Sequence, residues 1–363
     1  MKEIIFNIDH IDPMGQGVFK NNKDIYFIRK TLPKEEGLAT VFKKTKGVHK
    51  AVVKSMDISS TQRTSPKCPH YAACPACHFL HCSYRDELSF KRNTLARFLK
   101  GFVDEDMIKI IAAPKRDGYR NRVQFHYDLK QNKIGYKDAL LDRIVPVSHC
   151  LIISPSLKKH IDESMKRREW REYAKKAGNE KGHVEYFERE GKCFTAFNRR
   201  YAKGGFTQVN SQMNKILKQT LKAHLKGDVL ELFSGNGNLT EQYKDGKIHC
   251  IDFYGEKEEA GEDIFFPLDL YNKQSLEKYA SHGKKLSRVD TLLLNPPRSG
   301  FSLLKNWVDE FNPERVIYIS CHPATMVRDL KNISGKVQSV YLMDLFPSTY
   351  HFEVMVELNL AGD

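Results

Sequence analysis

The stretch from Asp228 to Asn238, DVLELFSGNGN, places a short apolar strand directly before a turn that contains two glycines. Three more apolar stretches follow along the chain: IHCID at 248–252, VDTLLLN at 289–295 and RVIYIS at 315–320. Strands rich in Val, Ile and Leu that alternate with helical or loop stretches are typical of a parallel sheet covered by helices. The sequence therefore predicts an α/β fold for residues 206–363, with a helix at 212–225 before it and two closing strands, SVYLMDLF and FEVMVELNL, at its end.

Charge is unevenly distributed along the chain. The 363 residues include 59 Lys and Arg against 45 Asp and Glu, a net charge of +14. Residues 1–205 hold 41 basic and 24 acidic side chains (+17), and residues 206–363 hold 18 and 21 (−3). A long basic region favours binding to nucleic acid, because neutralising phosphates releases counterions. A basic surface that only keeps the protein in solution is the alternative.

The composition excludes a disordered chain and a membrane protein. Hydrophobic residues make up 40% of the sequence and charged residues 29%, which is enough apolar material for folded cores. No apolar stretch approaches the ~20 residues of a membrane-spanning helix. The start, MKEIIFNIDH, has no apolar signal segment. We therefore expect a cytoplasmic monomer with no membrane partner.

The amino-terminal half predicts two further domains. Residues 1–60 alternate apolar and polar positions between turns, which indicates a small β-barrel like those that bind oligonucleotides. Next come a group of cysteines, the stretch 87–102 with the pattern of an amphipathic helix with a basic outer face, and a hairpin at 119–138. We predict three domains: the barrel at 1–60, a central α+β domain at 61–205 and the α/β domain at 206–363.

Polar residues follow the predicted parallel strands, where an open α/β sheet binds its ligand. Gly235 and Gly237 let the backbone approach a nucleotide-like cofactor closely, although a tight turn without a ligand explains the same pattern. The third glycine of the dinucleotide motif is absent, which leaves room for S-adenosylmethionine. Asp252 ends the next strand, where a carboxylate can bind ribose hydroxyls, and Asp269 could meet the adenine. Each acid alone could equally be a solvated surface residue.

Three short motifs end strands in the last third of the chain. Asn295-Pro296-Pro297-Arg298 stops a central strand and fixes the loop above the sheet. Cys321 directly follows RVIYIS, which would place its thiol beside the cofactor, although cysteines are often simply buried apolar residues. Glu353 begins the final apolar strand and is either solvated or directed into the same cleft.

The cysteines near residue 70 predict a metal site. Cys68, Cys74 and Cys77 follow the pattern C-x5-C-x2-C, and Cys150 is the candidate for a fourth ligand. In a protein of the cytoplasm such a group binds metal more often than it forms disulfides. Four thiolates suit an iron-sulfur cluster and structural zinc alike, and the spacing does not choose between them.

Together these features resemble the RNA uracil-5-methyltransferase family, in particular its iron-sulfur ribosomal RNA members. The resemblance covers nearly the whole chain. It rests on the barrel, which is similar to a TRAM domain, on the cysteine pattern, and on the motifs FTQVN (206–210), SGNGN, NPPR, SCHPAT (320–325) and HFE (351–353). The order and spacing of the last three are the most specific. The family implies a Rossmann-like methyltransferase domain at 206–363.

The resemblance implies a reaction and a role for each site residue. A thiolate, here Cys321, adds to carbon 6 of uracil, carbon 5 accepts the methyl group of S-adenosylmethionine, and Glu353 then removes the proton from carbon 5. The four cysteines Cys68, Cys74, Cys77 and Cys150 would bind a 4Fe-4S cluster, with zinc less favoured. The cofactor-binding residues would be Gln208, Phe233, Gly235, Gly237, Asn238, Asp252, Asp269 and Asn295.

The sequence departs from the family at three places and leaves other functions open. In the cysteine region, Pro75 and Ala76 stand where paired glycines are common, and Leu80 stands where a Gln is usual. Asn295 stands where the family usually has Asp, and residues 254–263 replace a full crossover helix. We prefer 23S ribosomal RNA as substrate, with transfer RNA as the alternative. An amino-group methyltransferase would explain Asn295-Pro296-Pro297 but leaves Cys321 and Glu353 without purpose. A non-catalytic RNA-binding protein is the remaining alternative.

Overall fold

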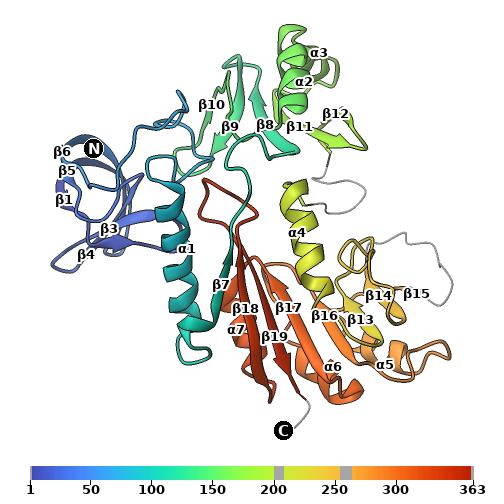
Figure 1. Cartoon of the computed structure of the whole chain (residues 1–363). Coiled ribbons are helices and arrows are strands. Elements are labelled where there is room, and N and C mark those ends of the chain that lie inside the picture. Colours follow the sequence, from blue (N-terminus) through green and yellow to red (C-terminus); the bar gives the residue numbers. More distant parts are fainter. Residues whose placement is uncertain (1, 200–207, 254–263, 361–363) are drawn as a thin grey trace.

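The structure is a computed structural model that describes residues 2–199, 208–253 and 264–360. The described residues form three β-sheets, of six, five and eight strands (Figure 1). Phe206 and Thr207 of the FTQVN motif, the predicted domain boundary at 205 and the unusual segment 254–263 lie outside the described residues.

The amino-terminal sheet is a curled, open version of the predicted barrel. Its strands lie in the order β1-β5-β6-β4-β3-β2, and β1 and β2 form its two edges instead of pairing with each other. Aromatic and aliphatic side chains such as Phe6, Tyr26 and Ile28 fill its concave side. The strands are β1 (Glu3–Asn7), β2 (His10–Ile11), β3 (Gln16–Asn21), β4 (Asp24–Arg29), β5 (Glu36–Thr45) and β6 (Val48–Ile58).

The predicted amphipathic helix is α1 (Tyr84–Leu99), which Ser83 caps by accepting a hydrogen bond from the Asp86 backbone N–H. Its basic residues are not all on an outer face, because Lys91 is 1% exposed. After η1 (Glu105–Met107), strand β7 (Ile108–Ile111) pairs in parallel with β18 (Lys336–Met343) of the large sheet. Two elements from the range 61–205, α1 and β7, thus pack with the carboxyl-terminal sheet, which a division by sequence alone did not indicate.

The five-stranded sheet contains the predicted hairpin. Its order is β10-β9-β8-β11-β12, formed by β8 (Arg122–Asp128), β9 (Lys133–Asp138), β10 (Arg143–Val145), β11 (Lys181–Arg189) and β12 (Lys192–Phe197). Two helices, α2 (Pro155–Lys166) and α3 (Glu169–Lys176), cover one side of it through Leu157, Ile161 and Trp170.

The eight-stranded sheet confirms the predicted α/β fold. Strands β13 to β17 run parallel, and β19 lies antiparallel between β17 and β18. Helix α4 packs on one face, whereas α1, α5, α6 and α7 pack on the other. The elements not yet defined are α4 (Ser211–Lys222), β13 (Val229–Leu232), β14 (Ile248–Asp252), β15 (Ile264–Pro267), α5 (Gln274–Ala280), β16 (Thr291–Leu294), α6 (Leu304–Phe311), β17 (Arg315–Ser320), α7 (Pro323–Leu330) and β19 (Glu353–Asn359).

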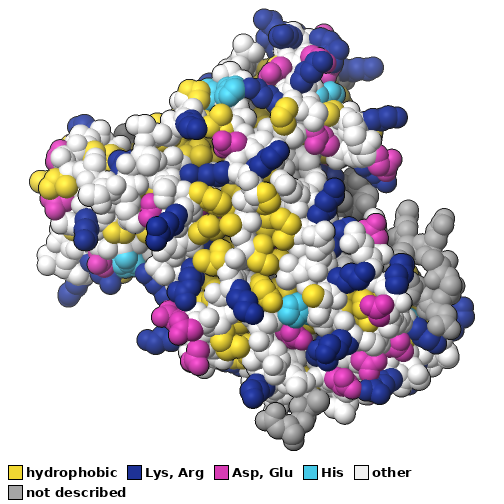
Figure 2. All heavy atoms as spheres, in the orientation of Figure 1, with side chains coloured by type: hydrophobic (Ala, Val, Ile, Leu, Met, Phe, Trp, Pro, Cys, Tyr) yellow, Lys and Arg dark blue, Asp and Glu magenta, His cyan; other side chains and the backbone are white. Residues whose placement is uncertain are grey.

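The surface in Figure 2 shows Lys and Arg side chains spread over all three parts of the molecule, with apolar side chains gathered in the middle of the view, between α1 and α4. Among the helices of the described residues, none is both long and apolar enough to pass through a bilayer.

Candidate active site

One large cleft, with a volume of about 1850 Å³, brings together residues from all three sheets. Its floor is formed by loops that follow β13, β14, β16 and β17 and by the start of β19. The amino-terminal sheet contributes Gln16 and Arg29, and the five-stranded sheet contributes Gln124 and Tyr136. The cleft is lined by all of the predicted catalytic and cofactor residues except Gly237, namely Gln208, Phe233, Gly235, Asn238, Asp252, Asp269, Asn295, Cys321 and Glu353.

The turn after β13 has the shape that its glycines predict. Phe233, Gly235 and Gly237 all have positive φ angles, of 58°, 54° and 70°. Glycine adopts this conformation without a steric penalty, so the turn can reverse within a few residues. The Gly235 backbone N–H donates to the Asp252 carboxylate at 2.9 Å, which joins the ends of two neighbouring strands. Gly237 shapes the turn through its N–H bond to the Ser234 carbonyl but does not line the cleft.

Aromatic side chains form one wall of this end of the cleft. The Phe233 ring lies 5.5 Å from that of Tyr271 and 5.0 Å from that of Phe301. The Tyr271 hydroxyl donates to the Gly300 carbonyl at 3.0 Å, and its ring is 46% exposed. Asp269 accepts a bond from the Tyr271 backbone N–H at 3.0 Å. An exposed ring beside Asp252 and Asp269 offers a stacking surface for a planar ligand.

Four buried polar atoms that belong to cleft-lining residues have no hydrogen-bond partner among the described residues. They are His78 Nδ1, Gln208 Oε1, Ser234 Oγ and Glu353 Oε2. Buried polar groups are nearly always paired in folded proteins, so unpaired ones in a cleft indicate that a ligand completes them. Asn238 is already committed, because its side-chain amide exchanges two hydrogen bonds with that of Asn214, at 3.0 and 3.1 Å.

Cys321 and Glu353 come together through antiparallel pairing of two strands distant in sequence. Ser320, the last residue of β17, lies opposite Val354 in β19, so the residues that follow and precede them are neighbours at the edge of the sheet. Burial, and secondly the nearby Glu353 carboxylate, raise the pKa of the Cys321 thiol. Burial raises the pKa of Glu353 to about 8. The site thus holds a thiol beside a carboxyl that accepts a proton near neutral pH.

Arg298 is the charged group that sequence reasoning left without a role. Its guanidinium lies against the Cys321 thiol and opposes the rise in the pKa of that thiol and of Glu353. It also approaches His351 Nδ1 at 3.5 Å. Burial, and then the Arg298 charge, lower the pKa of His351 to about 4, so this imidazole is neutral at physiological pH. Arg298 directly follows the two prolines, and that position was the available signal.

The four predicted metal ligands Cys68, Cys74, Cys77 and Cys150 line one small apolar cavity, together with Tyr71 and Leu80. Burial raises the pKa of Cys74 to about 11, and burial together with the charges of the other three cysteines raises that of Cys77 still further. In the described part of the chain, no three His, Cys, Asp or Glu side chains gather closely enough to hold a metal ion. The cysteines therefore converge on a common space without forming a single-ion site.

The cleft also contains basic side chains that no motif indicated. Arg29, Lys30 and Arg120 line it from the two smaller sheets. Arg29 pairs with Asp138 at 2.7 Å, and Lys30 donates to the Cys74 carbonyl at 2.7 Å. Burial lowers the pKa of Lys30 to about 8. Only the excess of basic residues in the first 205 positions pointed to this part of the cleft.

Comparisons with known proteins agree over most of the chain. The family described as tRNA (Uracil-5-)-methyltransferase matches residues 271–360, which include Asn295, Cys321 and Glu353. The chain is 26% identical to a 23S rRNA (uracil(1939)-C(5))-methyltransferase from Klebsiella pneumoniae, over 97% of this chain and 95% of that protein. It is 24% identical to the protein of the same description from Shewanella sp. strain MR-4, over 98% and 95% of the two chains.

The fold is also that of a solved structure. The Pyrococcus abyssi tRNA (uracil-54, C5)-methyltransferase, in complex with S-adenosyl-L-homocysteine, has a TM-score of 0.70 and 19% identity over 98% of this chain and 100% of that one. The family match, the full-length relatives and the shared fold confirm the predicted resemblance. This chain belongs to the RNA uracil-5-methyltransferase family, whose enzymes use S-adenosylmethionine to methylate carbon 5 of a uridine in RNA.

Proposed function

We propose that this enzyme methylates a uridine of 23S ribosomal RNA through a covalent adduct at Cys321. The observation that carries the mechanism is the pairing of Cys321 with Glu353 in one cleft, beside Asp252 and Arg298. The relatives named for 23S rRNA match the chain from end to end, which favours ribosomal over transfer RNA. Transfer RNA is the second candidate because the matching family and the solved structure carry that description.

Cys321 is the proposed nucleophile. Its thiolate adds to carbon 6 of the uracil, so an Sγ–C6 bond forms and the electrons of the C5–C6 double bond move to carbon 5 and the carbonyl oxygen. Burial disfavours the free thiolate, and the Arg298 guanidinium offsets this cost by its positive charge. Arg298 would therefore stabilise the Cys321 thiolate twice, before it attacks carbon 6 and again when the Sγ–C6 bond breaks.

S-adenosylmethionine supplies the methyl group, and a C5–CH₃ bond forms as the sulfonium–CH₃ bond breaks. The residues that would hold this donor are the eight cofactor residues predicted from the sequence, all but one of which line the cleft. Asp252 would accept hydrogen bonds from the ribose hydroxyls. Phe233 and Tyr271 would stack on the adenine, and the unpaired Gln208 Oε1 and Ser234 Oγ would each gain a partner.

Glu353 is the proposed general base. After methyl transfer, its carboxylate takes the proton from carbon 5, the C–H electron pair restores the C5–C6 double bond, and the Sγ–C6 bond breaks to return the Cys321 thiolate. A pKa of about 8 makes this carboxylate a stronger base than an exposed glutamate. Its unpaired Oε2 is consistent with a group whose partner is the substrate.

Cys68, Cys74, Cys77 and Cys150 are the proposed ligands of a 4Fe-4S cluster. Zinc draws its thiolates to ~2.3 Å from one point, whereas a cluster is held by four cysteines around a larger group. The four thiols line one shared cavity, as the ligands of such a cluster would. Its positive iron atoms would also offset the burial that disfavours the thiolates.

RNA would contact the amino-terminal sheet and the five-stranded sheet, the region with a balance of +17. We propose that the predicted divisions at 60 and 205 mark the RNA-binding parts and the catalytic part, although α1 and β7 pack with the latter. The target uridine would be flipped into the cleft from its place in the RNA. Such a substrate also implies a cytoplasmic enzyme.

The deciding experiment is to map 5-methyluridine in ribosomal and transfer RNA from a deletion strain, with and without the restored gene. Loss of the modification from one position of 23S rRNA is the expected result. Loss from transfer RNA instead would favour the second candidate.

For the cluster, iron and acid-labile sulfide should be present at about four of each per chain after anaerobic purification, and stoichiometric zinc with no visible absorbance would contradict the proposal.

A further inference from the structure

The loop that precedes Glu353 is held mainly by groups from the amino-terminal half of the chain. It joins β18 to β19 and comprises residues 344–352, which we name the return loop. Its backbone carbonyls accept bonds from Asn210, Lys91 and Tyr119, at Leu345 (3.2 Å), Phe346 (3.3 Å) and Pro347 (3.0 Å) respectively. A loop whose polar groups are bonded in this way has little freedom to shift.

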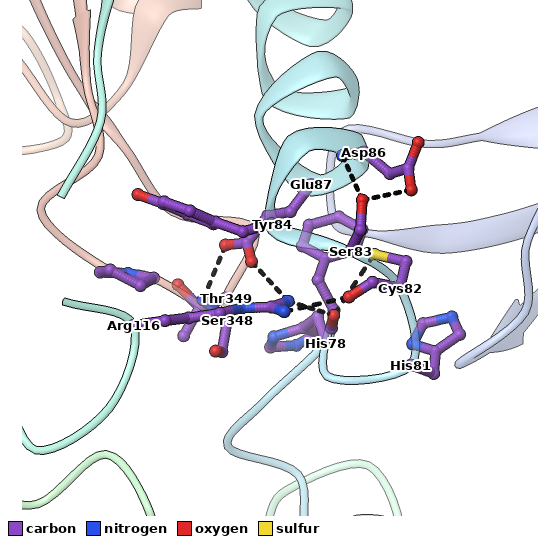
Figure 3. A network of polar contacts seen from close by, with 12 residues as sticks. His78, His81, Cys82, Ser83, Tyr84, Asp86, Glu87, Arg116, Ser348 and Thr349 are labelled. Carbon is purple, nitrogen blue, oxygen red and sulfur yellow. Dashed lines mark hydrogen bonds and ion pairs between the residues drawn. The ribbon is translucent and has the colours of Figure 1, made fainter. Parts of the chain in front are cut away.

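Ser348, in the return loop, is held through both its carbonyl and its N–H. It is completely buried and has a φ angle of 69°, a backbone conformation that residues other than glycine rarely adopt. Its carbonyl accepts bonds from the backbone N–H groups of His78 (2.7 Å) and Phe79 (3.1 Å), next to Cys77. Its own N–H donates to Glu87 Oε1 at 2.6 Å, so the residue is fixed from both sides (Figure 3).

Glu87 is a fully buried carboxylate at the start of α1. Lys91 donates to it at 2.7 Å, and the Arg116 guanidinium lies 2.8 Å from its other oxygen, as Figure 3 shows for Arg116. Lys91 also donates to Asp344, the first residue of the return loop, at 2.7 Å. Such a buried cluster costs desolvation energy. Of its two carboxylates, that of Glu87 accepts a bond from the return loop, and that of Asp344 belongs to the loop.

We infer that Glu87 is a positioning residue for the base Glu353. The bond from Ser348 to Glu87 holds the return loop five residues before Glu353, at a residue whose backbone has a strained conformation. Cys321 is carried by a different connection, between β17 and α7. Loss of Glu87 should therefore slow proton removal from carbon 5 and leave attack by Cys321 largely intact. The inference rests on the proposed covalent mechanism.

The test separates methyl transfer from proton removal. RNA with tritium at carbon 5 of its uridines is mixed with an excess of the full-length enzyme and methyl-labelled S-adenosylmethionine, and methyl incorporation and tritium release are timed in the same reaction. A covalent RNA–protein adduct is measured on a denaturing gel. In the wild type the two rates should agree and little adduct should remain.

Glu87→Leu keeps the size of the side chain but cannot accept the Ser348 N–H. We expect methyl incorporation within ~3-fold of wild type and tritium release ~10- to 100-fold slower, because a misplaced catalytic group commonly loses this much. The adduct should accumulate accordingly. Glu87→Gln retains an acceptor for Ser348 and should show a smaller delay, and it serves as the second variant where Glu87→Leu fails to fold.

Glu357→Gln is the matched control, because it breaks another buried ion pair in the same strand as Glu353. Glu357 accepts from His224 at 2.7 Å and from Arg315 at 3.1 Å, at the far end of β19. The two rates should stay equal in this variant. Equal slowing of methyl incorporation and tritium release in both Glu87 variants would overturn the inference.

Glu353→Gln distinguishes this inference from the mechanism beneath it. If Glu353→Gln accumulates the adduct while neither Glu87 variant does, the positioning role is wrong and the proposed mechanism stands. If no adduct forms with Glu353→Gln, the covalent mechanism itself fails.

Discussion

Replacing Glu353 by glutamine should make the protein more stable at alkaline pH. The Glu353 side chain is almost completely buried, and one of its carboxyl oxygens has no partner among the described residues. Burial disfavours its charged form and raises its pKa in the folded protein to about 8 from an ordinary value of 4.5. Glutamine has nearly the same shape but carries no charge at any pH.

The size of the effect follows from proton linkage. Below pH 4.5 the carboxyl is protonated in both the folded and the unfolded chain, so it imposes no penalty. Above that pH the unfolded chain releases the proton while the folded protein keeps it, so stability falls until pH passes 8. At 1.36 kcal/mol per pKa unit, the penalty is about 1.4 kcal/mol at pH 5.5 and of the order of 5 kcal/mol at pH 8.5.

Thermal unfolding of wild type and Glu353→Gln, without RNA or cofactor, measures this difference. The variant should gain roughly 5 to 10 °C in Tm over the wild type between pH 5.5 and pH 8.5. Glu357→Gln is the control, because its stability relative to wild type should change in the opposite direction at pH 8.5. Although burial raises the pKa of Glu357, its bond to His224 lowers it overall, so that variant should be less stable than wild type at pH 8.5. Melting temperatures of Glu353→Gln and wild type that stay parallel across this range would refute the reasoning.

Three further outcomes can be checked on the same protein. Cys321→Ala should abolish 5-methyluridine formation and adduct formation in an RNA methylation assay, whereas unchanged methylation would exclude it as the nucleophile. Asp252→Ala should weaken S-adenosylmethionine binding ~10-fold or more by calorimetry, because it removes both the proposed ribose contact and the bond from Gly235. Lys91→Met should destabilise the fold by about 3 to 5 kcal/mol in urea unfolding, because Glu87 and Asp344 would each lose a buried positive partner.

Local patterns in the sequence were sufficient for much of the site. The apolar strands before Phe233, Asn295 and Cys321 predicted a parallel sheet, and in such a sheet the strand ends share one edge. This geometry brought Asp252 and Cys321 into one cleft without further information. The four cysteines could be grouped by spacing, although Cys150 was assigned only as the remaining candidate.

Other features depended on contacts that no local pattern encodes. The basic outer face predicted for α1 is wrong at Lys91, because this helix packs against the large sheet and Lys91 meets Asp344, 253 positions later in the chain. The predicted barrel is an open sheet, since alternation of apolar residues specifies a buried face but not which edge strands pair. The pairing of β7 with β18 in the large sheet was not predicted for the same reason, because a short apolar stretch has many possible partners.

The sequence by itself determined the α/β class, the order of the strands that carry polar residues at their ends, and the chemical types of the reacting groups, because these follow from short-range periodicity and from side-chain chemistry. Only the tertiary structure decided the pKa values and the positions of those groups. Glu353 becomes a base with a pKa of about 8 through burial, and Arg298 counters that burial from a different loop. Glu87 holds the return loop from a helix more than 250 residues earlier. Burial and contact between distant segments are properties of the fold, and they set the pKa values and positions on which the proposed reaction depends.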